Sequence, residues 1–232
     1  MTGPLRSMGA CGLRLKAVIR DSRGVAMVEM AFIAPILLFL GVVGIEMANY
    51  AVTTMRISQA AMHVADNGSR IGDRSSLSAQ KIYESDINDL LVGVRIQVGS
   101  KVDLFEHGRV VLSSLEQNAD GGQWIHWQRC MGKKVADSSY GTEGTGASGT
   151  SFAGMGQSGK EIKAGPGQAV MFVEIQYDYQ PLLDTSVTAP FVPTAPIAAT
   201  SAFNVRNTRD LSQVFQKATP ASVAACNKYE AI

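Results

Sequence analysis

The sequence predicts an α+β protein in which a long N-terminal membrane-spanning helix packs on a small antiparallel β-sheet domain. The first observation is an apolar run over residues 25–45 that only Glu29 interrupts. The second is a set of alternating segments in the C-terminal half, separated by glycine-rich turns. The third is a change of charge across the apolar run, which indicates that the body of the protein is exported.

The apolar run predicts the first part of one long helix over residues 25–72. About 20 helical residues cross the hydrocarbon core of a bilayer, so residues 25–45 are long enough to span it. Beyond Ile45, apolar residues continue at helical spacing up to Ala65. Gly68 and Gly72 are suitable terminators. The second half of the helix is therefore expected to lie against the exported domain.

The charge distribution predicts the orientation of this helix. The whole chain has 21 Lys and Arg and 20 Asp and Glu; five of the basic residues and one acid precede residue 25, which leaves 16 basic and 19 acidic residues after it. A basic side stays in the cytoplasm, so residues 73–232 are expected on the other side of the membrane. The near balance of charge excludes a nucleic-acid footprint.

Glu29 is the unusual residue of the apolar run. A lone carboxylate in hydrocarbon costs roughly 2.5 kcal/mol or more and by default needs a partner. If the chain is cut after Gly24, Glu29 becomes the fifth residue of a protein that begins with the ammonium group of Val25. A carboxylate one helical turn from an ammonium group can pair with it, on its own chain or on a neighbour.

This pattern resembles known processing sites. A basic leader that ends in Gly24, with Glu29 at the fifth position after it and an apolar helix beyond, resembles the processing site of type IV pilins. The fuller string from Gly24 through Val28-Glu29-Met30-Ala31 to Pro35 resembles the TadE-like minor pseudopilins of tight-adherence pili. The resemblance implies a cleaved leader over residues 1–24, a prepilin peptidase that recognises Gly24 and Val25, and Glu29 as a subunit-pairing residue.

The resemblance also implies a function and partners. It implies a minor pilin or pseudopilin that acts in the assembly or initiation of a tight-adherence pilus, and so in adhesion or biofilm formation. Its partners would be the inner membrane, other pilin subunits and the pilus assembly machinery. The resemblance also implies that residues 73–232 lie beyond a bacterial inner membrane, in the periplasm or in an extracellular pilus. The large body over residues 73–232 favours a minor or initiating subunit over the major pilin.

Other interpretations of the N-terminal segment stay open. The helix could be an uncut signal anchor of an envelope binding module, or a secretory signal that is removed. A removed signal needs a small-x-small site just after the apolar run, and residues 45–51 contain no Ala-x-Ala. An exported enzyme is a third alternative without a supporting motif.

In the body, residues 77–92 are expected to form a second helix that ends at Gly93. The alternating segments predict strands over residues 94–98, 109–115, 123–130 and 169–179, an edge strand over 201–205, and a short helix over 211–216. Residues 138–167 are rich in Gly, Ser and Thr and are expected to form a mobile or extended insertion. Trp124 and Trp127 are expected on opposite faces of their strand.

Two cysteines fall in the exported part of the chain. Cys130 and Cys226 are far apart in sequence, and in an oxidising compartment they predict one disulfide that holds the C-terminus to the middle of the domain. Two buried free thiols are the alternative. Neither cysteine has another ligand at metal spacing, so no metal site is expected.

No motif predicts catalysis or a cofactor. Residues 154–160 fit the start of a phosphate loop, but Glu161 follows where the mechanism needs Ser or Thr. No Gly-x-Ser-x-Gly occurs, and His63, His107 and His126 have no partner at useful spacing. The protein is therefore not expected to be an enzyme.

Overall fold

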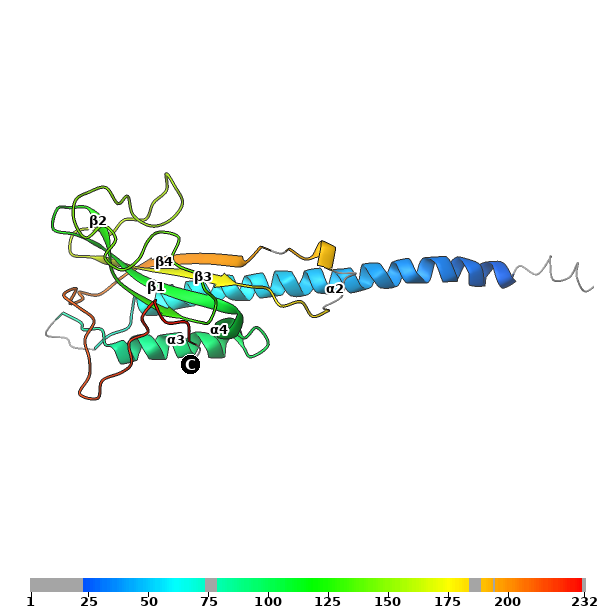
Figure 1. Ribbon diagram of the computed structural model, residues 1–232, viewed down its shortest axis with the longest axis horizontal. Coiled ribbons are helices and arrows are strands. Elements are labelled where there is room, and N and C mark those ends of the chain that lie inside the picture. The colour runs from blue at the N-terminus through cyan, green and yellow to red at the C-terminus, as the bar shows by residue number, and fades with distance from the viewer. Residues whose placement is uncertain (1–22, 74–78, 184–188, 194, 231–232) are drawn as a thin grey trace, which may run out of the picture.

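The computed structural model describes residues 23–73, 79–183, 189–193 and 195–230. Along the chain its elements are α2 (Arg23–Gly68), α3 (Glu84–Val98), α4 (Leu104–His107), β1 (Gly108–Gln117), β2 (Gln123–Met131), β3 (Ala169–Tyr177), η1 (Ala189–Phe191) and β4 (Ile197–Asn204) (Figure 1). A long apolar helix accompanies a four-stranded antiparallel sheet, which confirms the predicted fold class. Most of the predicted leader, residues 1–22, lies outside the described residues.

Helix α2 has two halves with different surroundings. Its 46 residues include Pro35 and extend over about 69 Å at 1.5 Å per residue. In the second half Ile57, Ala61 and Val64 are almost fully buried at helical spacing and form part of the core. The first half projects beyond the domain (Figure 1), and its most apolar 18-residue window has no buried residue.

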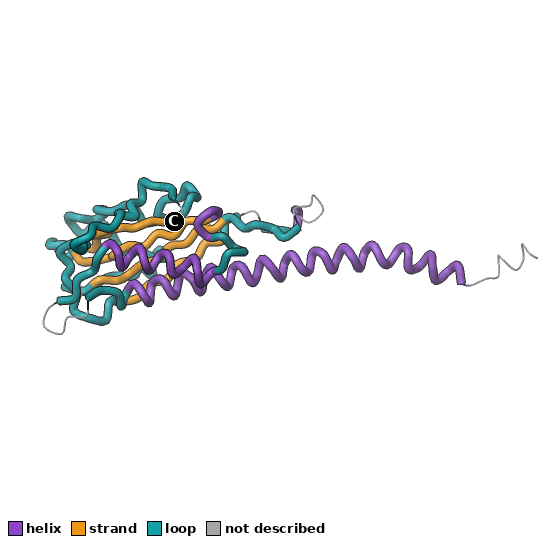
Figure 2. The backbone as a smooth tube through the Cα atoms, turned by 90° about the horizontal axis from the view of Figure 1, so that it is seen from below, coloured by secondary structure: helices purple, strands orange, loops and turns teal. Residues whose placement is uncertain are grey.

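The sheet has the strand order β2-β1-β3-β4. Helices α2 and α3 lie over one of its faces, as Figure 2 shows. On that face Leu112, Val173 and Ile175 pack against the helices in the main core. On the other face Leu115 and Phe172 belong to a second apolar cluster. Strand β4 lies at the sheet edge and begins earlier than the predicted edge strand over 201–205.

The predicted strand over residues 94–98 is wrong, because these residues form the last turns of α3. Leu90, Val94 and Val98 are buried at intervals of four, whereas Ile96 is 78% exposed. In a strand Ile96 would share a face with Val94 and Val98, but in a helix it points away from them. The helix passes through Gly93 and ends at Gly99, whose positive φ of 85° stops it.

The predicted helix over residues 211–216 is also wrong. This segment lies extended beside the residues that precede α3: Gln80 bridges to Arg209 and Tyr83 to Phe215, both in parallel. The Phe215 N–H donates to the Ile82 carbonyl at 2.8 Å. Backbone partners supplied by the residues before α3 therefore replace the local helix.

The Gly/Ser-rich insertion over residues 138–167 consists largely of turns and bends, and it packs on the sheet. Met155 and Ala164 are buried in the second apolar cluster, with Tyr140 against Phe172 at 5.2 Å between ring centroids. The side-chain amide of Asn118 donates to the carbonyls of Gly146 and Gly149, each at 2.8 Å. Buried apolar residues and hydrogen bonds from side chains of the sheet and its turns hold this segment over the sheet.

A bulge in β2 overturns the prediction that Trp124 and Trp127 lie on opposite faces. Trp127 pairs with Ser114 and Trp124 with Glu116, and the register shifts by one residue at Ser114/Leu115. Because Ser114 and Glu116 are two apart in a regular strand, both tryptophans lie on the helix-covered face. Trp124 stacks on His126 with 4.3 Å between ring centroids.

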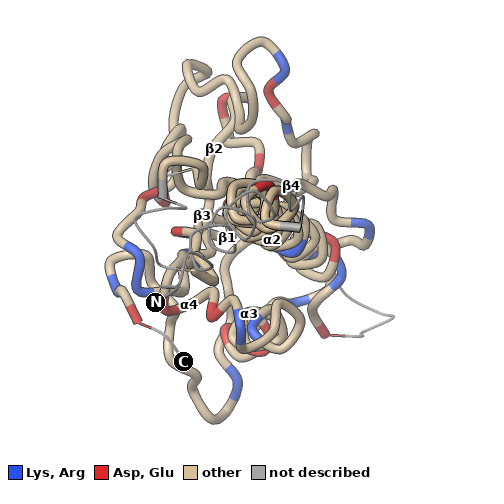
Figure 3. Tube along the Cα trace, turned by 90° about the vertical axis from the view of Figure 1, so that its right-hand side faces the viewer, with Lys and Arg blue, Asp and Glu red and all other residues tan. Residues whose placement is uncertain are grey.

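Charged residues are spread over the domain. Figure 3 looks along α2 and shows Lys and Arg interspersed with Asp and Glu around the helix, with no face of a single sign in this view. The helix itself is mostly uncharged, in agreement with its apolar sequence.

Candidate functional site: the exposed helix half and its junction with the domain

The predicted processing residues lie in the first turn of α2. The helix begins at Arg23, so the Gly24–Val25 bond lies at its start, far from the domain (Figure 1). A Cβ added to Gly24 would meet no atom within 4 Å. Val25 is 57% exposed. Among residues 23–73, 79–183, 189–193 and 195–230, none covers this bond, and their packing does not require glycine at position 24.

Glu29 lies one turn further along α2 and is exposed. Residues four apart share a face of a helix, so Val25 and Glu29 are neighbours on α2. The surrounding helix surface is apolar and equally uncovered, with Met27, Met30 and Phe32 among its exposed residues. Glu29 is therefore a single acidic residue on an exposed helix surface that is otherwise apolar.

A second acid, Glu46, ends the apolar run and has a different environment. It is 1% exposed. Its Oε1 accepts hydrogen bonds from the Tyr179 hydroxyl at 2.6 Å and from the Leu182 N–H at 3.2 Å, and its Oε2 accepts one from the Leu183 N–H at 3.1 Å. One carboxylate thus joins α2 to the chain that follows β3.

Tyr179 is the other centre of this junction. Its hydroxyl accepts a hydrogen bond from the Asn49 side-chain amide at 2.6 Å, and its ring contacts Tyr50 edge-on at 5.0 Å between centroids. Burial, followed by the hydrogen bond to Glu46, raises the pKa of Tyr179 to about 12. Residues from one turn of α2 therefore hold a neutral phenol against the carboxylate.

Beyond this junction the chain continues along α2 toward its exposed half. Figure 1 shows η1 beside the helix and outside the sheet domain. Phe191 of η1 contacts Phe39 edge-on, with 5.6 Å between ring centroids. Phe191 and Leu182 remain 50% and 60% exposed. An apolar part of the domain thus reaches the apolar half of the helix.

The C-terminal segment is attached to the end of the sheet that lies nearer to the projecting half of α2. A disulfide joins Cys130 to Cys226, the two cysteines that the sequence pairs. The Cys130 N–H donates to the Ala224 carbonyl at 2.8 Å. Buried Arg109 donates to the Cys226 and Lys228 carbonyls and lies over the Tyr229 ring at 4.2 Å. Burial lowers the pKa of Arg109, and these carbonyls compensate part of its lost hydration.

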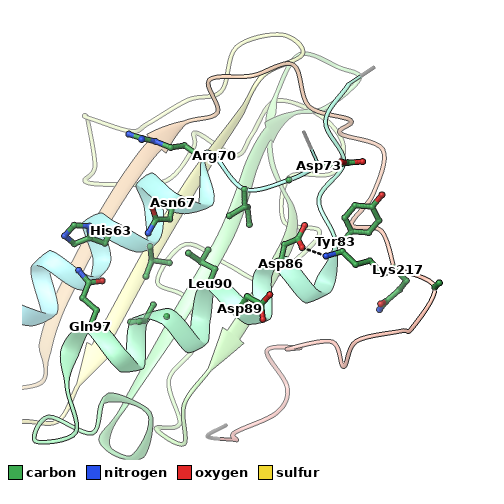
Figure 4. A pocket seen from close by; sticks show the side chains of 17 residues that line it. His63, Asn67, Arg70, Asp73, Tyr83, Asp86, Asp89, Leu90, Gln97 and Lys217 are labelled. Carbon is green, nitrogen blue, oxygen red and sulfur yellow. Dashed lines mark hydrogen bonds and ion pairs between the residues drawn. The ribbon is translucent and has the colours of Figure 1, made fainter. Parts of the chain in front are cut away.

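A groove of about 1020 Å³ opens between the C-terminal end of α2 and helix α3 (Figure 4). Val64 and Leu90 are among its apolar lining residues, and Asp86 and Lys217 form an ion pair at 2.7 Å on it. That hydrogen bond raises the pKa of Lys217. The groove combines an apolar floor with charges of both signs and lies at the opposite end of the domain from the projecting helix half.

Among residues 23–73, 79–183, 189–193 and 195–230 there is no group of three His, Cys, Asp or Glu side chains that could hold a metal ion. The Gly154–Lys160 motif lies in loops, without the strand and helix that a phosphate loop needs. His126 instead pairs with Glu116 at 2.8 Å. The absence of catalysis stays a prediction.

The structure keeps Gly24, Val25 and Glu29 within the first two turns of α2 and places Cys130 and Cys226 far from them, at the C-terminal segment. Sequence analysis missed Glu46 and Tyr179 as a pair. Their separation of 133 residues has no local signal. The available signal was the position of Glu46 directly after the apolar run, where a carboxylate also needs a partner.

Comparison with known proteins gives one match. Residues 24–66 match the family model described as TadE-like protein. No curated protein and no solved structure matches the chain. The match falls on the apolar helix, which is long enough to cross a membrane. The N-terminal helix thus matches the TadE-like family over residues 24–66, which confirms the resemblance that the pattern from Gly24 to Pro35 predicts.

Proposed function

We propose that this protein is a minor pilin-type subunit that a prepilin peptidase cuts after Gly24 and that acts in the assembly or initiation of a tight-adherence pilus. The observation that supports the proposal best is the uncovered apolar half of α2, with Glu29 one turn from Val25. After cleavage the ammonium group of Val25 and the carboxylate of Glu29 share one helix face. Each can then offset the other's charge, within a chain or between neighbouring subunits.

The arrangement of the molecule fits such a role. The domain buries only the second half of α2, so the first half is free to pack beside helices of other subunits after it leaves the membrane. The inner membrane, the peptidase and the other pilus subunits are the partners that this role requires. The domain would lie in the periplasm before assembly, which agrees with the disulfide between Cys130 and Cys226.

The first test is the intact mass of the protein extracted from the membrane of its native host. We expect a mass that lacks residues 1–24, with Val25 at the new N-terminus. Gly24→Val should leave the mass full-length, because a side chain would obstruct the peptidase, while the fold has room for it. A full-length mass for the unaltered protein would contradict the proposal.

The second test separates cleavage from assembly. Glu29→Ala should still be exported and cut but should be absent from sheared filaments, because the terminal ammonium group loses its partner. Glu29→Gln keeps the shape and removes the charge, and it should behave like Glu29→Ala. Normal incorporation of both variants would show that the carboxylate has no pairing role.

A membrane-anchored binding module with an uncut helix is the second candidate. The observation in its favour is the groove between α2 and α3, which has the size of a ligand or peptide site. A full-length mass, together with a partner that cross-links to Asp86→Cys in this groove, would support this candidate over the pilin role.

A further inference from the structure

The segment that follows β3 has an unusual composition for a connection on a protein surface. In the sequence, residues 185–205 contain no charged residue. In the described part of this segment Phe191 is 50% exposed, and Pro190, Pro193 and Pro196 follow each other at intervals of three. Proline has no N–H, so these residues reduce the number of backbone donors that need a partner.

The position of this segment along α2 is set by two contacts. Glu46 receives the Leu182 and Leu183 N–H groups where the apolar run ends. Phe191 of η1 contacts Phe39, which lies nearer to the leader on α2. Phe39 lies six residues before Ile45, which corresponds to about 9 Å along the helix axis.

This displacement matches the depth of an interfacial segment. If residues 25–45 span the bilayer, Glu46 lies at the boundary of the hydrocarbon and Phe191 lies about 9 Å inside it. Segments that bind the membrane interface bury their apolar side chains about 5–10 Å below the headgroups. At this depth Phe191 stays on the outer side of the midplane, which is about 15 Å below the boundary. The prolines around η1 reduce the number of backbone N–H groups that hydrocarbon would leave without a partner.

We propose that Leu182 and Phe191 of this protein insert into the outer interface of the bilayer beside α2, so that the domain rests on the lipid surface. The Glu46–Tyr179 junction holds this apolar segment at a constant height on the helix. The domain therefore contacts the membrane at a second place besides its helix. The inference rests on membrane insertion of residues 25–45 and concerns the protein before it enters a filament; it does not depend on cleavage or on Glu29.

The test measures the depth of single labelled cysteines in the full chain. Cys11→Ser removes the only cysteine outside the Cys130–Cys226 disulfide. A fluorescent NBD group is placed at Phe191→Cys, or at Leu182→Cys as a second variant that keeps the Phe39–Phe191 contact. The protein is reconstituted into vesicles of phosphatidylethanolamine and phosphatidylglycerol. In one set of vesicles, lipid with a nitroxide at acyl carbon 5 quenches NBD groups that lie in the bilayer. In a second set, iodide in the aqueous phase quenches NBD groups that are exposed to water.

Two further positions on α2 serve as controls. Phe32→Cys lies in the apolar run and is 73% exposed, so lipid nitroxide should quench its label. Met62→Cys is 52% exposed and lies 17 residues beyond Ile45, about 26 Å along the axis, so iodide should quench its label instead. The labels at 182 and 191 should be quenched by lipid nitroxide several-fold more than the label at 62, and by iodide several-fold less.

Each other outcome overturns the inference in a recognisable way. If the labels at 182 and 191 respond like the label at 62 while the label at 32 is quenched by lipid, the helix spans the bilayer but the segment stays in water. Labels at 182 and 191 that resist both quenchers would show that protein covers the segment. If lipid fails to quench even the label at 32, residues 25–45 do not span the bilayer, and the inference falls with that premise.

Discussion

At the scale of single residues, two carboxylates on α2 have opposite environments. Glu29 is exposed on the apolar half of the helix, whereas Glu46 is buried and accepts hydrogen bonds from one hydroxyl and two backbone N–H groups. Both interrupt apolar sequence, and the sequence alone predicts a role only for Glu29. Their different surroundings predict different consequences of the same substitution.

Glu46→Ala should release the Leu182 and Leu183 amides from α2. A hydrogen bond to a charged group is worth about 1.5–3 kcal/mol, so the exchange of these two amides should accelerate by roughly 10- to 100-fold. Hydrogen exchange with mass spectrometry on the detergent-extracted chain measures this. Glu29→Ala is the matched control and should leave the same amides unchanged. Equal exchange in the two variants would contradict the role assigned to Glu46.

Tyr179 should make the stability of the domain sensitive to alkaline pH. Its pKa is about 12 in the folded protein and about 10 when unfolded. The folded state therefore keeps the proton that the unfolded state releases, and the associated stability is complete below pH 10 and is lost as the pH rises toward 12. Urea unfolding at pH 9 and pH 11 should show a smaller alkaline loss for Tyr179→Phe than for the unaltered protein. Tyr177, whose pKa is also raised to about 12, is present in both proteins, so its own contribution to the alkaline loss should remain in Tyr179→Phe.

At the scale of elements, one buried ion pair connects α3 to the sheet. Arg129 of β2 donates three hydrogen bonds to Glu84, the first residue of α3, at 2.5–3.1 Å. Burial alone would lower the pKa of Arg129, but the hydrogen bonds and charge of Glu84, with that of Glu143, raise it. The acid also lies in the first turn of α3, where the helix dipole favours it.

This pair predicts unequal effects for the two acids that contact Arg129. Glu84→Ala leaves an arginine side chain that is 10% exposed without its main partner, and should lower the free energy of unfolding by about 3–5 kcal/mol. Glu143 bonds the same guanidinium at 3.0 Å but is 54% exposed, so Glu143→Ala should cost less than about 1 kcal/mol. Urea unfolding followed by tryptophan fluorescence compares the two. Similar losses of unfolding free energy in the two variants would mean that burial does not determine how much each ion pair with Arg129 contributes to stability.

At the scale of the whole molecule, α2 divides into a part that the domain needs and a part that it does not. Ile57 to Ala65 contribute five residues to the core, whereas the most apolar window of the helix is wholly unburied. Tyr179, Leu182 and Leu183 bond Glu46 near the division. The division lies close to the end of the predicted membrane span at Ile45.

A chain that begins at Gly44 should therefore fold and stay in solution without detergent, because it keeps Glu46 and all core residues of α2. A chain that begins at Ser69 should fail to fold, because the sheet face under α2 loses its cover. Near-UV circular dichroism, to which buried Trp127 contributes, distinguishes folded from unfolded chains. Native-like spectra from the shorter chain would show that α2 is dispensable for the domain.

The sequence by itself determined the features that depend on neighbouring residues. The apolar run and the alternation in β1, β2 and β3 are local patterns, and each predicted its element correctly. The TadE-like resemblance also rests on a short contiguous string and is confirmed over residues 24–66. Local patterns succeed here because helix and strand periods are set by the backbone and can be read from one segment.

Only the tertiary structure decided the features that depend on distant partners. The spacing of Val94 and Val98 fits both a helix and a strand. The residues are helical because Leu90 and Leu91 of the same helix α3 face the same core. The 211–216 segment found backbone partners beside residues 80–83, and the β2 bulge moved Trp124 to the face of Trp127. Glu46 meets Tyr179, and Phe39 meets Phe191, through contacts between residues more than 130 positions apart. Hydrogen bonds and burial at such separations leave no periodic trace in the sequence, so they become visible only when the chain is folded.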